Sequence, residues 1–444
     1  MHTKRIWCVG AAVLLSAVAC DSPLEVEPIN EVEESEAIID AGSARAALAG
    51  LYDALQSGSY YGGNYLFITE LPSDNASHVG TFTTFADIDQ HVTTADNSTI
   101  EGMWDAIYDG IGRANTLIVK VDGVSDLEQG EKDDMKGQAL FMRALHYHNL
   151  VRVWGGVPIR TEPPPSIDEL SNTARASVAE VYTQIVADLT QAAQLMDGEE
   201  RTRKASVGAV DALRSRVELY RGNYAAAEAA ANATIAHGYE LAEQFSDLFS
   251  PAGSDTPEDI FRTSFTATEF NNVGFYYLSK SIGGRWELAP TSSLQTAFEA
   301  GDARGAWSIA IDSRRRVYGS KFPTAVGDED LHVIRLAEVL LNKAEAQARQ
   351  NKLAEAVATY NLIRARAHVR EHVLGSDVTT QTQVIEAIWA ERRRELAFEG
   401  DRWPDLVRTG RAATLLNIPT FRTLFPIPQN EIDVAPLLVQ NPGY

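Results

Sequence analysis

Residues 368–372 read His-Val-Arg-Glu-His and match the HxxEH pattern of inverted zinc peptidases. Two histidines four positions apart on one helix could share a zinc ion, with Glu371 as the general base. A pattern with three fixed positions arises easily by chance, however, and the helical periodicity fades directly afterwards, in residues 373–376. We therefore expect solvated loop histidines here. A zinc hydrolase using His368, Glu371 and His372 remains a remote alternative.

A second segment that could do chemistry, residues 391–402, is dense in charge. Its acidic and basic residues recur at the three- and four-residue spacing that allows pairing along a helix, namely Glu391, Arg392, Arg394 and Glu395. Leu396 and Phe398 of the same segment are expected to face inward. This pattern favours a partly buried ion-pair network that braces the helix against the C-terminal tail. Catalysis is the less favoured alternative.

Aromatic and polar residues gather in two further regions, and this composition suits sugar recognition. Flat rings contact the C–H faces of sugars, while amide, carboxylate and guanidinium groups bond hydroxyls. The candidate ligand-binding residues are Tyr60, Tyr61, Tyr65, Asp74, Asn75, Tyr276, Tyr277, Arg285 and Trp286. For each tyrosine, simple packing in the core is an equally open alternative. Trp104 lies within a helical pattern and is expected in the core.

The composition is that of an ordinary globular protein, with 45% hydrophobic and 23% charged residues among 444. Acidic residues outnumber basic ones by 61 to 39, which gives a formal charge of −22. A surface this negative repels phosphate backbones, so nucleic-acid binding is not expected. The acidity is equally compatible with simple solubility and with a saline habitat.

The first residues read as a targeting signal. Lys4 and Arg5 precede the apolar run 6–19, which is too short to span a bilayer but suits the core of a signal peptide. Small residues just before Cys20 resemble a bacterial lipoprotein processing site, which implies cleavage before Cys20 and its acylation. An ordinary secretory signal is the alternative. Cys8 lies in the segment to be removed, so the mature chain could form no internal disulfide.

Periodicity divides the chain into five parts. Residues 1–19 form the signal peptide, and residues 20–41 form a lipidated N-terminus with an acidic tether. A helical region follows from 42 to 237, then a loop-rich variable region from 238 to 328. The last part, 329–444, combines helices with a Pro-rich tail. The sequence therefore predicts a mostly α fold.

Helical patterning begins near Gly42, where five apolar residues are expected to share one face: Ala46, Leu48, Leu51, Tyr52 and Leu55. Residues 57–97 are expected to form a loop. Further helices are predicted at 101–120, 131–153, 176–196, 205–220, 224–237, 329–348, 353–368 and 383–399.

Two of the predicted helix pairs resemble each other. In each pair a polar turn leads to a bulky residue, Tyr224 or Leu353, followed three positions later by alanine. A small residue lies twelve positions before that alanine, as Ser215 before Ala227 and Ala344 before Ala356. This is a degenerate tetratricopeptide pattern, in which small residues let paired helices approach closely. It predicts a helical-repeat scaffold and nothing about its ligand.

Three stretches point to a known family. Residues 143–158 read RALHYHNLVRVWGGVP, and residues 391–403 read ERRRELAFEGDRW and continue to DLVR at 405–408. Near the end stand LFPIPQNEI at 424–432 and QNPGY at 440–444. Together they closely resemble the SusD/RagB family of nutrient-uptake outer-membrane lipoproteins. The likeness runs along the whole chain and is weakest from 238 to 328.

The resemblance implies a SusD-like, tetratricopeptide-based helical lipoprotein anchored in the outer membrane by lipid alone and exposed at the cell surface. Such a protein acts as a lid on a SusC-like TonB-dependent transporter. It captures an oligosaccharide or, in some branches, a peptide, without covalent chemistry and without a cofactor. Oligosaccharide capture is our leading hypothesis, and a tetratricopeptide adaptor that binds only protein is the alternative from another class.

Three residues depart from the family pattern. Pro404 replaces a residue that is usually aromatic, so the helix there is expected to end or kink early. His146 and His148 stand where aromatic residues are more common, which should alter packing slightly.

Overall fold

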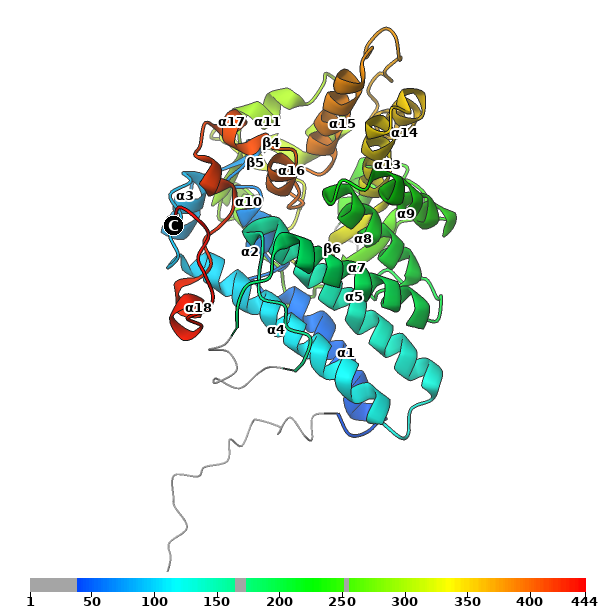
Figure 1. Ribbon diagram of the computed structural model, residues 1–444. Coiled ribbons are helices and arrows are strands. Elements are labelled where there is room, and N and C mark those ends of the chain that lie inside the picture. The colour runs from blue at the N-terminus through cyan, green and yellow to red at the C-terminus, as the bar shows by residue number, and fades with distance from the viewer. Residues whose placement is uncertain (1–37, 164–172, 251–254) are drawn as a thin grey trace, which may run out of the picture. The chain divides into compact units, whose positions relative to one another are not determined.

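The computed structural model describes residues 38–163, 173–250 and 255–444. By position in the sequence, its long helices form an N-terminal and a C-terminal group, which the colours of Figure 1 distinguish. The first group comprises α1 (Ala41–Gln56), α4 (Ser98–Lys120), α5 (Gln129–Trp154), α7 (Val178–Leu195), α8 (Val207–Tyr220) and α9 (Tyr224–Ala236). The second comprises α13 (Leu336–Arg349), α14 (Leu353–Arg366) and α15 (Gln381–Glu395). The predicted mostly α fold is confirmed.

Side-chain caps set where several of these helices begin. Asp40 caps α1, Ser177 caps α7 and Thr380 caps α15, and in each case the backbone N–H of the capping residue also donates to the side chain of the third helical residue. These capping boxes satisfy backbone N–H groups that the first turn leaves unpaired. The helix start signals are therefore local, and sequence patterns can find them.

Helix α5 is the central element. It packs against α4 on one side and α7 on the other, and every residue from Gly137 to Trp154 is buried. A helix that is buried all round must bury its polar residues too, and these then need partners. In α5 they include Arg143, which forms a buried ion pair of 2.7 Å with Asp188 of α7.

The two repeat-like pairs, α8–α9 and α13–α14, pack around small residues. Ala227 and Ala346 form a buried cluster with Leu219, and Tyr224 packs against it. Ser215, Ala344 and Ala356 are fully buried as well. The close approach that the spacing of small residues predicted is therefore present, and α13 contacts both α9 and α14.

The strands are short and form three antiparallel pairs. They are β1 (Ala76–His78) with β3 (Leu288–Pro290), β2 (Asp259–Thr263) with β6 (Leu331–Arg335), and β4 (Ile309–Ile311) with β5 (Val317–Gly319). Strand β5 also contacts β3 and the short helix α10 (Val273–Tyr277). Segments near residues 78, 276 and 317 therefore lie close together, although they are far apart in the sequence.

The remaining elements are short. The α-helices are α2 (Asn64–Ile68), α3 (Thr83–Asp89), α11 (Ser292–Ala297), α12 (Ala303–Ser308), α16 (Arg402–Arg408), α17 (Ala412–Leu416) and α18 (Gln429–Val434). The 3-10 turns are η2 (Val121–Gly123), η3 (Phe245–Phe249), η4 (Lys280–Ile282) and η5 (Thr420–Thr423).

Several predicted boundaries were wrong. The expected loop at 57–97 contains α2, β1 and α3. The helix expected from 329 is preceded by β6, because residues 331–335 pair with β2, about seventy positions earlier in the chain. Ala46 is exposed, unlike Leu48, Leu51 and Leu55. At residues 331–335, pairing with the distant strand β2 overrides the local helical periodicity.

Pro404 does not end or kink a helix, contrary to what was expected from the sequence. The chain leaves α15 at Glu395, and Pro404 lies in the first turn of α16. In a first turn the missing N–H of proline has no intrahelical acceptor to lose, so the ring is tolerated. The early end of α15 instead coincides with left-handed backbone at Phe398 (φ 68°) and Gly400 (φ 85°).

The irregular C-terminal tail returns to the end of α5. Trp154 Nε1 donates to the carbonyl of Pro426 at 2.9 Å, and Asn441 Nδ2 donates to the carbonyls of Trp154 and Phe425 at 3.0 and 2.7 Å. These bonds join the 143–158 stretch to the 424–444 tail. Two of the motif stretches thus form one structural unit.

The N-terminal predictions lie outside the described residues: the signal peptide 1–19, the acylated Cys20 and most of the tether 20–41. From Ile38 onward, within the described part of the chain, no helix combines the length and the apolar character needed to cross a membrane.

Candidate functional site

The structure buries the first group of candidate residues, Tyr60, Tyr61 and Tyr65. Their exposed fractions are 0%, 2% and 1%. Asn149 of α5 donates to the hydroxyls of Tyr60 and Tyr61 at 2.6 and 3.0 Å and accepts from Tyr65 at 2.9 Å. Of the two alternatives that the sequence left open, packing applies to these tyrosines, and their rings offer no face to a surface ligand in this structure.

Asp74 and Asn75 hold a loop in place. Asp74 forms ion pairs with Arg402 at 2.7 Å and Arg393 at 3.1 Å. Asn75 is fully buried, donates to Glu70 at 2.9 Å and accepts from Arg393 at 2.9 Å. Burial raises the pKa of Glu70 to about 8, against a smaller opposing effect of its hydrogen bonds. These contacts brace residues 70–75 against the 391–402 segment.

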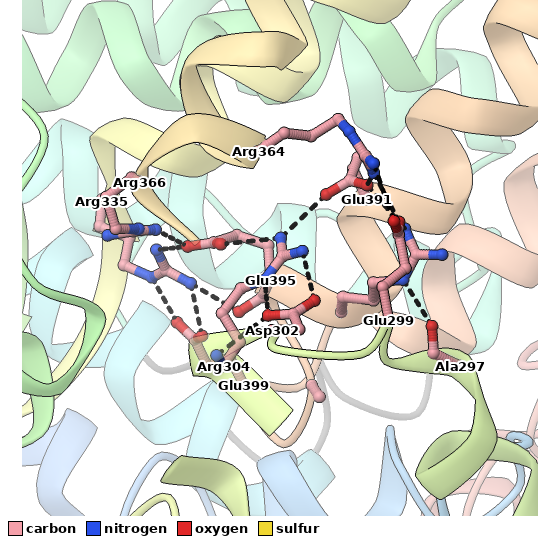
Figure 2. Close-up of polar contacts among 12 residues, drawn as sticks. Ala297, Glu299, Asp302, Arg304, Arg335, Arg364, Arg366, Glu391, Glu395 and Glu399 are labelled. Atoms are coloured by element: carbon pink, nitrogen blue, oxygen red, sulfur yellow. Dashed lines mark hydrogen bonds and ion pairs between the residues drawn. The ribbon is translucent and has the colours of Figure 1, made fainter. Parts of the chain in front are cut away.

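The charged segment itself forms a buried network, shown in Figure 2. Arg304 donates to Glu391 at 2.9 Å and contacts Glu395 at 3.3 Å, and all three side chains are fully buried. Other members are Glu258, Glu299, Asp302, Arg335, Arg364, Arg366, Arg394 and Glu399. The predicted ion-pair network is confirmed, although it joins α15 to α14, α12 and β6 more than to the tail.

The network also has inward-facing apolar neighbours, as predicted. Leu396 and Phe398 have exposed fractions of 3% and 1%. Arg392 does not pair with the nearby glutamates as the helical spacing suggested. It bonds Asp405 of α16 at 2.7 Å instead, because α16 folds back against α15. A network this buried supports the fold and offers no site to a ligand.

The HxxEH residues do not share a helix face. Helix α14 ends at Arg366, and His368 follows in a turn with left-handed backbone (φ 60°). His372 is half-buried and lies 2.9 Å from the Tyr360 hydroxyl. Across residues 38–163, 173–250 and 255–444, no group of three His, Cys, Asp or Glu residues is placed to hold a metal ion.

The second group of candidates lies at the surface. We define the aromatic patch as Phe82, Phe275, Tyr276, Arg285, Trp286 and Arg316, all half-buried. The Arg285 guanidinium lies 4.1 Å from the centroid of the Phe82 ring, and the Arg316 guanidinium lies 4.8 Å from that of Trp286. The Tyr276 ring lies 5.6 Å from Phe82 and 5.5 Å from Phe275. Tyr277, by contrast, is buried against Phe398 at 4.7 Å.

Backbone hydrogen bonds fix the loop that carries Trp286. The N–H groups of Arg285 and Trp286 donate to the carbonyls of Phe275 and Leu278 at 2.6 and 3.0 Å. Trp286 adopts left-handed backbone (φ 55°), which is unusual for a bulky residue. Such strain persists only where the surroundings enforce it, and it clusters at binding sites. The loop conformation is therefore held in place before any ligand arrives.

A buried carboxylate brings Phe82 to the patch. Glu287, with a 1% exposed side chain, accepts from the N–H groups of Thr81 and Phe82 at 2.5 and 2.6 Å and from Arg285 at 2.9 Å. His78 Nε2 lies 3.2 Å from the same carboxylate. Although burial raises its pKa, these bonds leave the pKa of Glu287 below its usual value. The charged carboxylate thus ties residues 78–82 to residues 285–287.

Sequence reasoning missed three members of the patch: Phe82, Phe275 and Arg316. They come from separate segments that the β1–β3 and β4–β5 pairs bring together. Of the three, only Phe275 could have been found from the sequence, because it is adjacent to the candidate residue Tyr276. The assembled patch combines ring faces with guanidinium donors, a combination suited to noncovalent recognition of a sugar.

The half-buried aromatic patch lies at the surface of a helical-repeat scaffold. Two family models match the chain: one described as "Starch-binding associating with outer membrane" over residues 23–219, and one described as the SusD family over residues 317–420. The chain belongs to the SusD/RagB family. Members of this family are binding proteins that recognise glycans and associate with the outer membrane.

Individual relatives are similar to this protein along nearly its whole length. SusD-like protein P38 of Formosa agariphila is 26% identical, over 96% of each chain. A SusD superfamily protein from Bacteroides vulgatus has the same fold, with a TM-score of 0.83 at 22% identity over 91% of this chain and 99% of that one. Surface glycan-binding protein A from Bacteroides fluxus gives a TM-score of 0.79 at 25% identity over 92% and 100%.

Proposed function

We propose that this protein is a surface-exposed outer-membrane lipoprotein that captures a glycan on its aromatic patch and passes it to a SusC-like TonB-dependent transporter. The observation that carries the proposal is the placement of the Trp286 and Phe82 rings beside the guanidinium groups of Arg316 and Arg285. Ring faces bind the C–H surfaces of sugars, and guanidinium groups donate hydrogen bonds to oxygens. Capture of this kind needs no covalent chemistry.

A glycan is favoured over a peptide by the relatives. One family model is described as starch-binding, and the B. fluxus relative is named as a surface glycan-binding protein. A patch of half-buried rings held by a strained loop also suits rigid sugar rings. An extended peptide would instead gain affinity from an open strand edge or a groove.

Attachment through Cys20 is supported by the sequence before the folded body. The apolar run 6–19 ends in small residues before Cys20, and acidic residues follow it. Several acyl chains, at roughly 0.8 kcal/mol per buried methylene, anchor a protein stably. The acidic tether would then separate the folded body from the membrane.

Isothermal titration of the chain carrying Cys20→Ser against neutral and acidic oligosaccharides tests the binding function. We expect at least one glycan to bind, and Trp286→Ala to weaken that binding at least tenfold. Trp389→Ala is the matched control, since Trp389 is a half-buried tryptophan that also lies beside two arginines, Arg349 and Arg411, at 5.4 and 4.9 Å. Binding of no glycan, or equal loss in both variants, would contradict the proposal.

Delivery to a transporter needs a separate test. Affinity purification of the native lipoprotein from outer membranes should recover a TonB-dependent β-barrel in near-stoichiometric amount. Recovery of only soluble proteins would favour the adaptor alternative instead.

A further inference from the structure

A hairpin of basic residues borders the aromatic patch. Strands β4 and β5 are joined by residues 312–316, which read Asp-Ser-Arg-Arg-Arg. Strand β5 contacts α10, which carries Phe275 and Tyr276, so the hairpin lies beside the patch (Figure 1). Lys280 and Arg285 add two further cations in the neighbouring loop.

The hairpin is built to turn its acidic residue inward. Asp312, with a 1% exposed side chain, accepts from the N–H groups of Arg314 and Arg316 at 2.8 and 2.9 Å. It also accepts from the Ser279 hydroxyl at 2.7 Å and from the Arg316 side chain at 2.8 Å. The negative charge of Asp312 is therefore compensated by hydrogen bonds and by the ion pair with Arg316.

The two arginines at the tip, by contrast, are open to solvent. Arg314 and Arg315 are exposed, and neither side chain has an ion pair or hydrogen bond to any residue in the described part of the chain. The same holds for the exposed Lys280. Arginines elsewhere in this fold are typically paired, as Arg304 and Arg335 are. Three unpaired cations thus stand on the two loops that carry patch residues Arg316 and Trp286.

This local charge is opposite to that of the molecule. The formal charge of the chain is −22, so the protein as a whole repels anions. A local cluster of unpaired cations gives an anionic ligand one favourable place to bind. Guanidinium groups can also bond the hydroxyls of a neutral glycan, but they match carboxylate and sulfate-type oxygens with paired, charge-assisted hydrogen bonds that are stronger.

We propose that the ligand class is an anionic glycan, carrying uronate carboxylates or sulfate esters, whose acidic groups bind Arg314 and Arg315 while its sugar rings contact the aromatic patch. This inference rests on the proposed glycan-binding function and specifies it. The exposed Lys280 adds a further cation in the loop that leads to Trp286.

Affinity electrophoresis in native gels tests the charge requirement with matched polysaccharide pairs. The pairs are polygalacturonate with its methyl ester, and dextran sulfate with dextran. We expect the acidic member of at least one pair to retard the protein at least tenfold more strongly than its neutral partner. Raising NaCl from about 50 to about 300 mM should weaken that retardation, because salt screens exposed charges.

Substitutions test whether the arginines of the hairpin cause the preference for the acidic glycan. The double variant Arg314→Ala/Arg315→Ala should lose at least tenfold in affinity for the acidic glycan and keep its folded circular dichroism spectrum, since neither side chain has a partner. The control Lys132→Ala/Lys204→Ala removes the same formal charge from α5 and the loop before α8 and should retain binding. Trp286→Ala should also weaken binding to the acidic glycan.

The outcomes separate the two proposals. Equal affinity for both members of a pair, with loss in Trp286→Ala, would overturn the anionic preference and leave glycan capture intact. Retardation that depends on Arg314 and Arg315 but not on Trp286 would indicate simple charge adsorption, as to an anionic lipid surface, and would overturn the inference. Binding of neither member of any pair would count against both.

Discussion

The Arg316 guanidinium lies 4.8 Å from the centroid of the Trp286 ring, and the Trp286 Nε1 donates to the Val317 carbonyl at 3.0 Å. Strand β5 therefore fixes both the plane and the position of the indole. A ring fixed before binding loses less conformational entropy when a ligand arrives. The geometry of the loop that carries Trp286 should consequently control the affinity for the glycan.

Gly284 offers a test of that control. A Cβ at Gly284 would lie 2.1 Å from the Leu278 carbonyl oxygen, so Gly284→Ala must displace the loop that carries Trp286. We expect glycan affinity to fall at least tenfold in isothermal titration while the helical circular dichroism signal persists. Gly130→Ala is the control, because a Cβ there has no neighbour within 4 Å. Unchanged affinity in Gly284→Ala would show that the loop geometry is unimportant.

Breaking the buried network should destabilise the fold without touching the patch. Glu395 is fully buried and pairs with Arg304, Arg335 and Arg366. Glu395→Ala removes the carboxylate that these three guanidinium groups share. The remaining acidic partners, Glu258, Asp302, Glu391 and Glu399, then leave buried positive charge uncompensated, at a cost of about 3–5 kcal/mol in the free energy of unfolding. Urea unfolding measures this loss, and the exposed Glu371→Ala should change the free energy by less than about 0.5 kcal/mol. Equal stability of the two variants would contradict the structural role of the network.

His146 should make the fold sensitive to acid. Burial lowers its pKa to about 3, and no described residue bonds its Nε2. Below pH 6.5 the unfolded chain binds a proton that the folded chain does not, so stability falls as pH drops from about 6.5 towards 3. The loss from this residue is on the order of 2 kcal/mol at pH 5.

The variant His146→Asn should therefore lose less Tm than the parent chain between pH 7.5 and pH 5. The comparison uses the pH-dependent difference within each chain, so a uniform loss of packing in the variant does not affect it. An identical drop in Tm in both chains would show that His146 does not cause the acid sensitivity.

Lipid attachment should depend on Cys20. In cells that express the full chain, Cys20→Ser should move the protein from the outer-membrane fraction to the soluble periplasmic fraction. Labelling with a radioactive or clickable fatty acid should mark the parent chain and not the variant. Persistence of the variant in the membrane fraction would indicate another anchor.

Local patterns predicted the long helices because their signals are local. Capping residues such as Ser177 act within one turn of their own position, and the small residues that let helices pack recur at a fixed spacing in the sequence. The motif stretches likewise predicted the family, since the 143–158 stretch and the tail carry it in their own sequence. Strand β6 was missed because its partner lies far away along the chain.

The binding surface was harder to predict, because exposure is a property of the assembled fold. Tyr60 and Trp286 both stand in Gly- and aromatic-rich stretches, yet Tyr60 packs against α5 and Trp286 lies at the surface. Arg316 and Phe82 join the patch only through strand pairing and through Glu287. No local pattern distinguishes such residues from others of the same type.

Hydrogen–deuterium exchange with and without the bound glycan tests the central claim most directly. If the glycan binds the aromatic patch, peptides covering residues 275–286 and 312–318 should exchange more slowly when it is present. Peptides of α13 and α14 should be unchanged. Protection confined to the repeat helices, with none in the two loops, would contradict the account.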